Sequence, residues 1–113
     1  MVIVAGALIT AIFGITIASG AASRAPEFKG IANWINSPPL TMEELQGQVV
    51  LVDFWTYTCP NCIRAMPHLK DWHAKYASEG SVIVRVHSPE FEFEKLTENM
   101  TQKVQDFSLE YPI

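Results

Sequence analysis

The sequence predicts an α/β fold, in which a strand, a helix and a second strand follow one another. Apolar β-branched and aromatic residues dominate residues 49–55 (VVLVDFW) and return at 81–87 (SVIVRVH). Between these runs, apolar residues recur every three or four positions, which is typical of an amphipathic helix. A strand, helix and strand in this order predict two parallel strands joined by a right-handed crossover.

Length and composition limit the chain to one domain and one further segment. It has 113 residues, of which 49% are hydrophobic and 18% charged, and its net charge is −4. A negative charge argues against a nucleic-acid surface. Two cysteines are too few for a disulfide scaffold, so a chemical role is favoured for them.

The N-terminal segment, residues 1–23, has no ionisable side chain. It is long enough to cross a hydrocarbon core of about 30 Å as a helix. Three interpretations fit: an uncleaved anchor, a cleaved signal peptide with small residues near its end, or the last helix of a larger membrane protein. We expect contact with a membrane through residues 2–22.

Residues 24–48 are interpreted as a linker and docking segment. Apolar anchors stand at Phe28, Ile31, Trp34 and Ile35. Thr41 and Glu44 have the spacing of a capping box, which predicts a short helical turn over residues 42–46.

The run 49–55 is apolar almost throughout, which is typical of a strand covered on both faces. Asp53 is the exception. A carboxylate in such a strand costs several kcal/mol, of the order of 2 to 7, unless it is hydrogen-bonded or neutralised. We interpret Asp53 as a partly buried acid that exchanges a proton with Cys62, and the alternative is an edge-facing aspartate without a role.

The two cysteines lie where the first strand gives way to the helix. Pro60 suits the first helical position, which places Cys59 at the N-cap and Cys62 one turn further. Unpaired amides and the positive end of the helix dipole favour the thiolate of Cys59. We therefore predict that Cys59 is the attacking thiol and Cys62 the resolving thiol.

Other uses of a Cys-x-x-Cys pair fit less well. A zinc site would need two more ligands, and His68 and His73 lie about 140° apart around the predicted helix. Covalent haem attachment would need a histidine directly after Cys62, where Ile63 stands. A purely structural disulfide would close a loop too small to constrain the unfolded chain.

The remaining elements follow from spacing and from helix breakers. The central helix is predicted from Pro60 to about residue 78, with Gly80 as its stop and Pro67 as a kink. Its inward stripe is predicted to comprise Cys62, Met66, Leu69, His73 and Tyr76. A second amphipathic helix is predicted from the stripe Leu96, Met100, Val104 and Phe107.

Two stretches carry a family resemblance: VDFWTYTCPNC (52–62) and HSPEFEFE (87–94). Together they resemble the redoxin domains of thioredoxin-fold proteins, and most of all the TlpA-like domains of the DipZ type. The resemblance implies a thioredoxin-like three-layer fold over residues 49–113. It implies Cys59 as nucleophile, Cys62 as resolving thiol and Asp53 as proton acceptor. Trp55, Pro60 and Asn61 would support the dithiol.

The same resemblance implies a thiol-disulfide oxidoreductase tethered to a bacterial membrane, with its redox domain in the periplasm or at the cell exterior. Its partners would be protein thiols and disulfides and a membrane protein that donates electrons. The process it would serve is cytochrome c maturation. It would use the Cys59–Cys62 disulfide and no other cofactor or metal. The alternatives are a peroxiredoxin-like peroxidase and a non-catalytic module that binds a metal or a partner.

The sequence departs from the family at its C-terminal end. Thioredoxin-like domains continue with a cis-proline loop, a closing hairpin and a last helix, and the chain stops before them. We expect a C-terminally truncated domain with an uncovered sheet edge. Pro112 is expected to start a strand.

Overall fold

The structure, a computed structural model, describes residues 23–113. It contains strands β1 (Val49–Trp55) and β2 (Ser81–His87) and helices α1 (Pro60–Tyr76) and α2 (Thr97–Asp106). Short 3-10 helices occupy Ala77–Glu79 and Glu92–Lys95. The predicted order of strand, helix and strand is confirmed.

The membrane or signal segment predicted for residues 1–23 lies outside the described residues, apart from Ser23. Within residues 23–113, no helix has the length and apolar character needed to cross a membrane.

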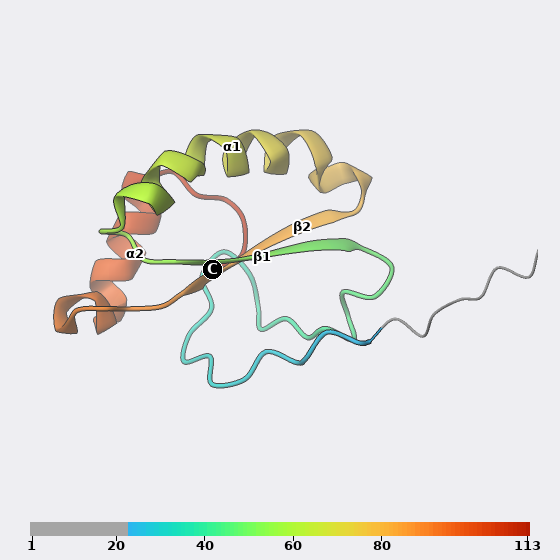
Figure 1. Cartoon of the computed structure of the whole chain (residues 1–113), viewed down its shortest axis with the longest axis horizontal. Helices are drawn as coiled ribbons and strands as arrows, with labels where there is room; N and C mark the ends of the chain where they lie inside the picture. Colours follow the sequence, from blue (N-terminus) through green and yellow to red (C-terminus); the bar gives the residue numbers. More distant parts are fainter. Residues whose placement is uncertain (1–22) are drawn as a thin grey trace, which may run out of the picture.

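The two strands pair in parallel, as predicted. Their register places Val49 opposite Ser81 and Asp53 opposite Arg85. Figure 1 shows α1 along one face of the strands and residues 24–48 along the opposite face. Both strands run toward the end of the molecule where α1 begins and where α2 lies (Figure 1). The start of α1 therefore lies at the carboxyl end of the sheet, where α/β proteins commonly bind their ligands.

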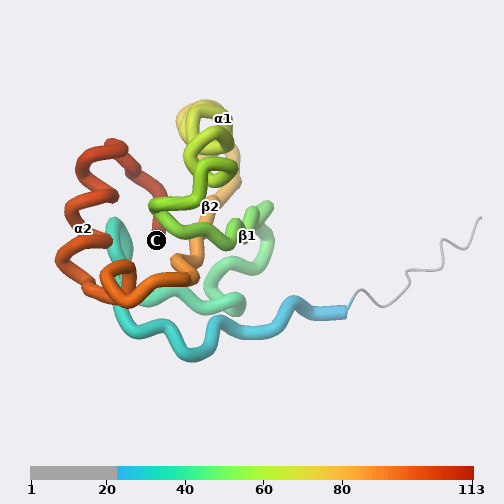
Figure 2. The backbone as a smooth tube through the Cα atoms, turned by 60° about the vertical axis from the view of Figure 1, so that its left-hand side comes forward, coloured from blue at the N-terminus to red at the C-terminus, as the bar shows by residue number. Residues whose placement is uncertain are grey.

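The hydrophobic core lies between the sheet, α1 and the segment that follows α2. Met66 and Leu69 of α1 are both buried, as the predicted inward stripe requires, whereas Tyr76 is 38% exposed. Residues 107–113 return from α2 to the middle of the molecule (Figure 2). The core cluster comprises Trp55, Tyr57, Met66, Leu69, Ile83, Met100, Val104, Leu109, Tyr111 and Ile113.

The prediction that β1 is covered on both faces is wrong for the described part of the chain. Val49 is 74% exposed and Phe54 is 67% exposed. Within residues 23–113, β2 is the only strand that pairs with β1, so β1 is an edge strand. Side chains on such a strand have strand neighbours on one side only, which leaves them open to solvent.

The N-terminal docking segment joins the end of the described chain. The backbone groups of Ile35 and Ile113 exchange two hydrogen bonds, of 2.8 and 3.0 Å. Arg85 N donates to the Pro112 carbonyl at 3.0 Å, so Pro112 lies beside β2, but residues 109–113 form no strand. The capping box is present, since Thr41 N donates to Glu44 Oε2 and Glu44 N donates to Thr41 Oγ1. The residues that follow it form turns instead of a regular helix.

Helix α1 ends as predicted. A 3-10 turn follows Tyr76, and Gly80 adopts φ +87°, a conformation that residues with a Cβ rarely take. Pro67 lies inside α1. Of the second predicted stripe, Met100 and Val104 are buried and Phe107 packs partly buried against the core, whereas Leu96 is 47% exposed.

Candidate active site

The dithiol occupies the N-terminus of α1. Pro60 is the first helical residue, and Cys59 is the N-cap with φ −72° and ψ 114°. Cys62 N donates a hydrogen bond to Cys59 Sγ at 3.4 Å. Both cysteines are free thiols and both are half-buried. The helix therefore begins where the sequence predicted, with one of its unpaired amides directed at the first sulfur.

The two thiols differ in acidity. Hydrogen bonds from the Cys62 side chain and then from its backbone N–H lower the pKa of Cys59. Burial raises the pKa of Cys62, and its hydrogen bond to Cys59 raises it further. The thiolate is the nucleophilic form of a cysteine. This difference favours Cys59 as the attacking thiol, the role expected from the sequence.

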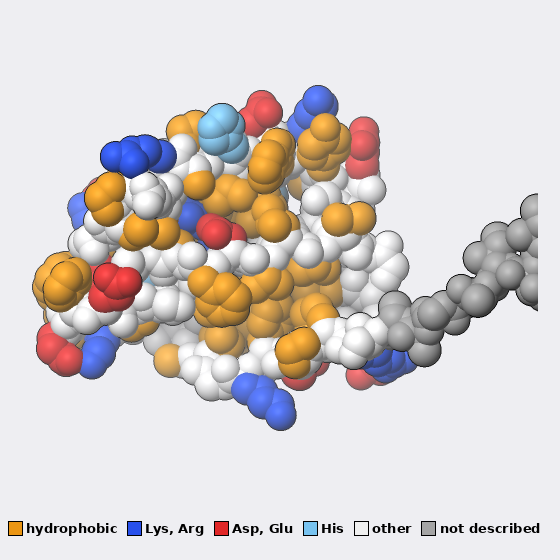
Figure 3. Space-filling view, viewed as in Figure 1, with side chains coloured by type: hydrophobic (Ala, Val, Ile, Leu, Met, Phe, Trp, Pro, Cys, Tyr) orange, Lys and Arg blue, Asp and Glu red, His pale blue; other side chains and the backbone are white. Residues whose placement is uncertain are grey.

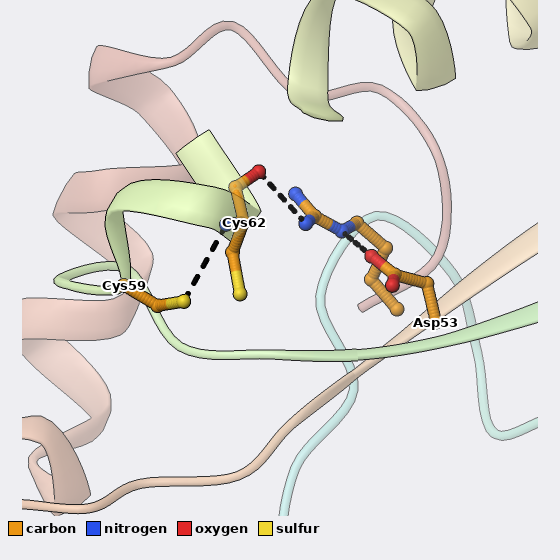
Figure 4. A network of polar contacts seen from close by, with 4 residues as sticks. Asp53, Cys59 and Cys62 are labelled. Carbon is orange, nitrogen blue, oxygen red and sulfur yellow. Dashed lines mark hydrogen bonds and ion pairs between the residues drawn. The ribbon is translucent and has the colours of Figure 1, made fainter. Parts of the chain in front are cut away.

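Asp53 is connected to Cys62 through hydrogen bonds of the Arg85 guanidinium. Arg85 Nε donates to Asp53 Oδ2 at 2.7 Å, and Arg85 Nη2 donates to the carbonyl of Cys62 at 3.5 Å. The Arg85 side chain is fully buried, while that of Asp53 is 31% exposed. Figure 4 shows Asp53 and Cys62 joined to this guanidinium by dashed lines. Asp53 is thus paired with a cation, and sequence reasoning did not identify this partner.

The strand register supplies a signal for the Asp53–Arg85 pair. Both predicted strands have seven residues, and pairing them from their first residues places Asp53 beside Arg85. Side chains opposite one another in a parallel pair lie on the same face of the sheet. Two charges of opposite sign at this position therefore predict an ion pair.

The remaining predicted site residues lie close to the dithiol in the fold. Trp55 is 2% exposed and belongs to the core cluster against which Cys62 packs. The guanidinium of Arg85 lies 4.1 Å from the centroid of the Trp55 ring. Pro60 and Asn61 are exposed on the first turn of α1, where Asn61 Oδ1 accepts from Arg64 Nη1 at 2.8 Å.

A second group of side chains, not identified from the sequence, surrounds the loop before Cys59. Glu94 is 1% exposed although it stands in an acidic stretch, and Thr58 Oγ1 donates to its Oε1. His87 stacks on Tyr57, with ring centroids 5.6 Å apart and planes inclined by 10°. Burial lowers the pKa of His87.

Residues 23–113 hold no group of three or more His, Cys, Asp or Glu side chains that could bind a metal ion.

Comparison with known proteins identifies the family. A family model described as thioredoxin-like matches residues 47–112. Protein DipZ of Mycobacterium tuberculosis is 42% identical over 92 residues, which cover 79% of this chain and 13% of DipZ. The thiol-disulfide oxidoreductase ResA of Halalkalibacterium halodurans is 31% identical over 74 residues, which cover 66% of this chain and 39% of ResA.

A solved structure shares the fold. The solution structure of a thioredoxin-like protein in the oxidized form superposes with a TM-score of 0.68 at 29% sequence identity, covering 78% of this chain and 59% of that one. The chain spans only about an eighth of the length of DipZ, the 13% noted above. The family match extends over more than half of the chain and includes β1, the dithiol, α1, β2 and α2. The chain belongs to the thioredoxin-like family, and DipZ and ResA are among its relatives.

Proposed function

We propose that the chain is a thiol-disulfide oxidoreductase that exchanges electrons with protein disulfides through Cys59 and Cys62. The position of Cys59 carries this proposal. Its sulfur caps α1 and accepts a hydrogen bond from Cys62 N at 3.4 Å, and its pKa is lowered while that of Cys62 is raised. A pair with this asymmetry has one thiol ready to attack and a second held protonated until it is needed.

The proposed reaction has two exchange steps. The Cys59 thiolate attacks one sulfur of a substrate disulfide, forming a mixed disulfide, and the other substrate sulfur leaves as a thiolate that takes up a proton. Cys62 then loses its proton and attacks the Cys59 sulfur, which releases the second substrate thiol. The substrate gains two electrons, and the chain is left with a Cys59–Cys62 disulfide. A dithiol donor protein must reduce this disulfide before the next turnover.

Asp53 is proposed as the acceptor of the Cys62 proton. Its carboxylate is 31% exposed and is connected to the Cys62 backbone through the Arg85 guanidinium. Partial exposure would let the carboxylate pass the proton to solvent, while Arg85 holds it beside the first turn of α1.

The oxidoreductase proposal is tested with insulin as a disulfide substrate. Cys59→Ser is expected to abolish insulin reduction, because serine cannot form the mixed disulfide. Cys62→Ser is expected to accumulate a mixed disulfide at Cys59, visible as a mass adduct that a reductant removes. Full activity in both variants would refute the proposal.

We also propose that the dithiol works outside the cytoplasm of a bacterium, attached to the membrane through residues 2–22 and engaged in cytochrome c maturation. The uncharged N-terminal run and the similarity to DipZ support this placement. In intact cells, a membrane-impermeant maleimide is expected to label the reduced chain, with the Cys59→Ser/Cys62→Ser variant as the unlabelled control. Labelling only after lysis would contradict the location and leave the thiol chemistry untouched.

A further inference from the structure

The three residues that precede Cys59 all form hydrogen bonds with the last residue of β2 or with the segment that follows β2. Thr56 Oγ1 lies 3.3 Å from His87 Nε2, and Tyr57 Oη donates to the carbonyl of Phe93 at 3.1 Å. Thr58 Oγ1 donates to Glu94 Oε1. Each side chain of the triplet therefore has a hydrogen-bonding partner within residues 87–94, which is the second stretch singled out in the sequence.

Glu94 is the centre of this contact. Its second oxygen, Oε2, accepts from the backbone N–H groups of Glu90 at 2.7 Å and Phe91 at 3.0 Å. The carboxylate therefore ties its own loop together with one oxygen and holds Thr58 with the other. It is 1% exposed, so water does not compete for these bonds.

Glu94 is held in its charged form. Burial alone would raise its pKa, but hydrogen bonds from Thr56, Thr58 and the backbone of Glu90 and Phe91 outweigh this effect and lower the pKa to about 2. An ionised carboxylate accepts stronger hydrogen bonds than a neutral group does. The contact to Thr58 is therefore charge-assisted throughout the pH range in which a thiol exchanges disulfides.

In the loop before Cys59, Thr56 and Tyr57 are buried, whereas Thr58 is exposed and is held by its hydrogen bond to Glu94. Residues 56–59 belong neither to β1 nor to α1. Their turn is closed by one backbone hydrogen bond, from Cys59 N to the Thr56 carbonyl at 3.3 Å. The hydrogen bond to the Cys59 sulfur measures 3.4 Å, so a small displacement of Cys59 weakens the contact that stabilises its thiolate.

We infer that Glu94 is a positioning residue for Cys59, acting through Thr58 to keep the attacking sulfur at the N-terminus of α1. Glu94 touches none of the reacting atoms. The inference rests on the proposed thiol chemistry and adds a residue from outside the Cys-x-x-Cys motif. On this inference, the acidic stretch after β2, residues 90–94, helps to set the reactivity of the Cys59 thiol.

Alkylation of the reduced chain by iodoacetamide, followed against pH with the modified peptide identified by mass, measures the reactivity of Cys59. In Glu94→Gln and in Thr58→Val, the midpoint of the pH profile is expected to rise. The alkylation rate below that midpoint should fall roughly three- to ten-fold, the change that a shift of about half to one pKa unit produces. Thr58→Ser keeps the hydroxyl and should retain the wild-type profile.

The same variants should shift the reduction potential of the dithiol. A less stable thiolate makes the reduced form less favourable, so the potential measured against glutathione is expected to become more negative. The double variant Thr58→Val/Glu94→Gln should be no worse than either single variant, because both changes remove the same hydrogen bond. Additive effects would contradict a shared route.

Glu44→Gln is the matched control. Glu44 also accepts a threonine hydroxyl, with Thr41 Oγ1 at 2.9 Å, but that pair lies in the docking segment, residues 24–48. Its alkylation profile should equal that of the wild type. Unchanged profiles in folded Glu94→Gln and Thr58→Val would overturn the inference, and Thr58→Val alone decides the matter if Glu94→Gln does not fold. Loss of insulin reduction in Cys59→Ser is a separate result and tests only the proposed function.

Discussion

At the scale of single residues, Arg85 defines the environment beneath the dithiol. Its side chain is fully buried, pairs with Asp53 and lies against the face of Trp55. One nitrogen, Nη1, has no hydrogen-bond partner among the described residues. A permanent positive charge thus lies next to the Cys62 carbonyl, where it lowers the pKa of Cys62 and opposes part of the effect of burial.

Removal of Arg85 should be costly because it leaves Asp53 without its partner. We expect Arg85→Met to lower the free energy of unfolding by about 2 to 4 kcal/mol, somewhat below a fully buried pair because Asp53 is 31% exposed. The double variant Asp53→Asn/Arg85→Met should recover part of this loss. Urea denaturation measures both.

Lys95→Met is the control for Arg85→Met. Lys95 pairs with Glu92 on the surface, where an ion pair contributes about 0 to 1 kcal/mol. Equal losses for Arg85→Met and Lys95→Met would show that burial of the Arg85 pair has no energetic consequence.

Glu94 should make stability depend on pH in the acid range. Its pKa falls from an ordinary value of 4.5 to about 2 on folding, because its hydrogen bonds outweigh burial. A carboxyl with a lower pKa in the folded chain adds stability that is complete above the unfolded pKa and is lost as pH falls toward the folded value. The difference in urea midpoint between wild type and Glu94→Gln is therefore expected to be largest above pH 5 and to shrink toward pH 2.

Glu92→Gln serves as the comparison for this pH dependence. Glu92 belongs to the same 3-10 helix, but its side chain is 89% exposed. Its urea midpoint should follow that of the wild type at every pH. A constant difference between wild type and Glu94→Gln across the range would mean that the carboxylate is not stabilised by folding.

Glu94 shows why part of the site could not be found from local sequence patterns. Asp53, Cys59 and Cys62 could be identified from the sequence because each is unusual beside its immediate neighbours. Glu94 stands among other acidic residues, a pattern that normally indicates a solvated surface, and its burial results from a contact with Thr58, 36 residues away. Contacts of this kind depend on how the elements pack, which local patterns do not contain.

At the scale of elements, β1 combines a functional end with an exposed edge. Trp55, at its carboxyl end, is buried beside the dithiol, whereas Val49 and Phe54 are exposed. Figure 3 shows apolar side chains gathered over the middle of the view, where Figure 1 places β1. An apolar strand with unpaired edge groups favours association between copies of a chain.

A charge on this edge should reduce association. Phe54→Lys is expected to lower light scattering at concentrations where the wild type associates, and to change the urea midpoint little because Phe54 is 67% exposed. Gln48→Lys adds the same charge just before β1 and should have a smaller effect. Scattering unchanged by Phe54→Lys would place the associating surface elsewhere.

The elements themselves could be predicted because their signals are local. The β-branched runs, the Cys-Pro start of α1 and the glycine at its end fix β1, α1 and β2 within a few residues. The burial of the two faces of β1 could not be predicted in the same way. A continuous apolar run indicates burial on two faces, but the neighbours that would provide it lie outside the run.

At the scale of the whole molecule, Asn36 joins the two ends of the described chain. Its Nδ2 donates to the carbonyls of Leu109 at 2.7 Å and Tyr111 at 3.2 Å. Its φ of +67° lies in the left-handed region, which asparagine tolerates better than most residues. Through Asn36, the docking segment is hydrogen-bonded to the residues that follow α2.

Loss of this side chain should destabilise the molecule in two separable ways. Asn36→Gly removes both hydrogen bonds and is expected to cost about 1 to 3 kcal/mol. Asn36→Ala should lower the free energy of unfolding by about 1 kcal/mol more, because a residue with a Cβ is strained in the left-handed backbone conformation. Urea denaturation distinguishes the two, with Asn33→Ala at an exposed hydrogen bond as the control. A stable Asn36→Gly would show that the bridge contributes nothing to folding.

The arrangement around Cys59 has a consequence for synthesis. The long-range hydrogen bonds of Asp53, Cys62 and the loop before Cys59 connect residues 53–62 with residues 85–94. A growing polypeptide leaves the ribosome from its N-terminus, so these groups emerge before α2 does. The N-terminus of α1 and its Cys59 cap can therefore form before Met100 and Val104 leave the ribosome. Any oxidant that meets the nascent chain at this stage would meet a reactive cysteine before the hydrophobic core is complete.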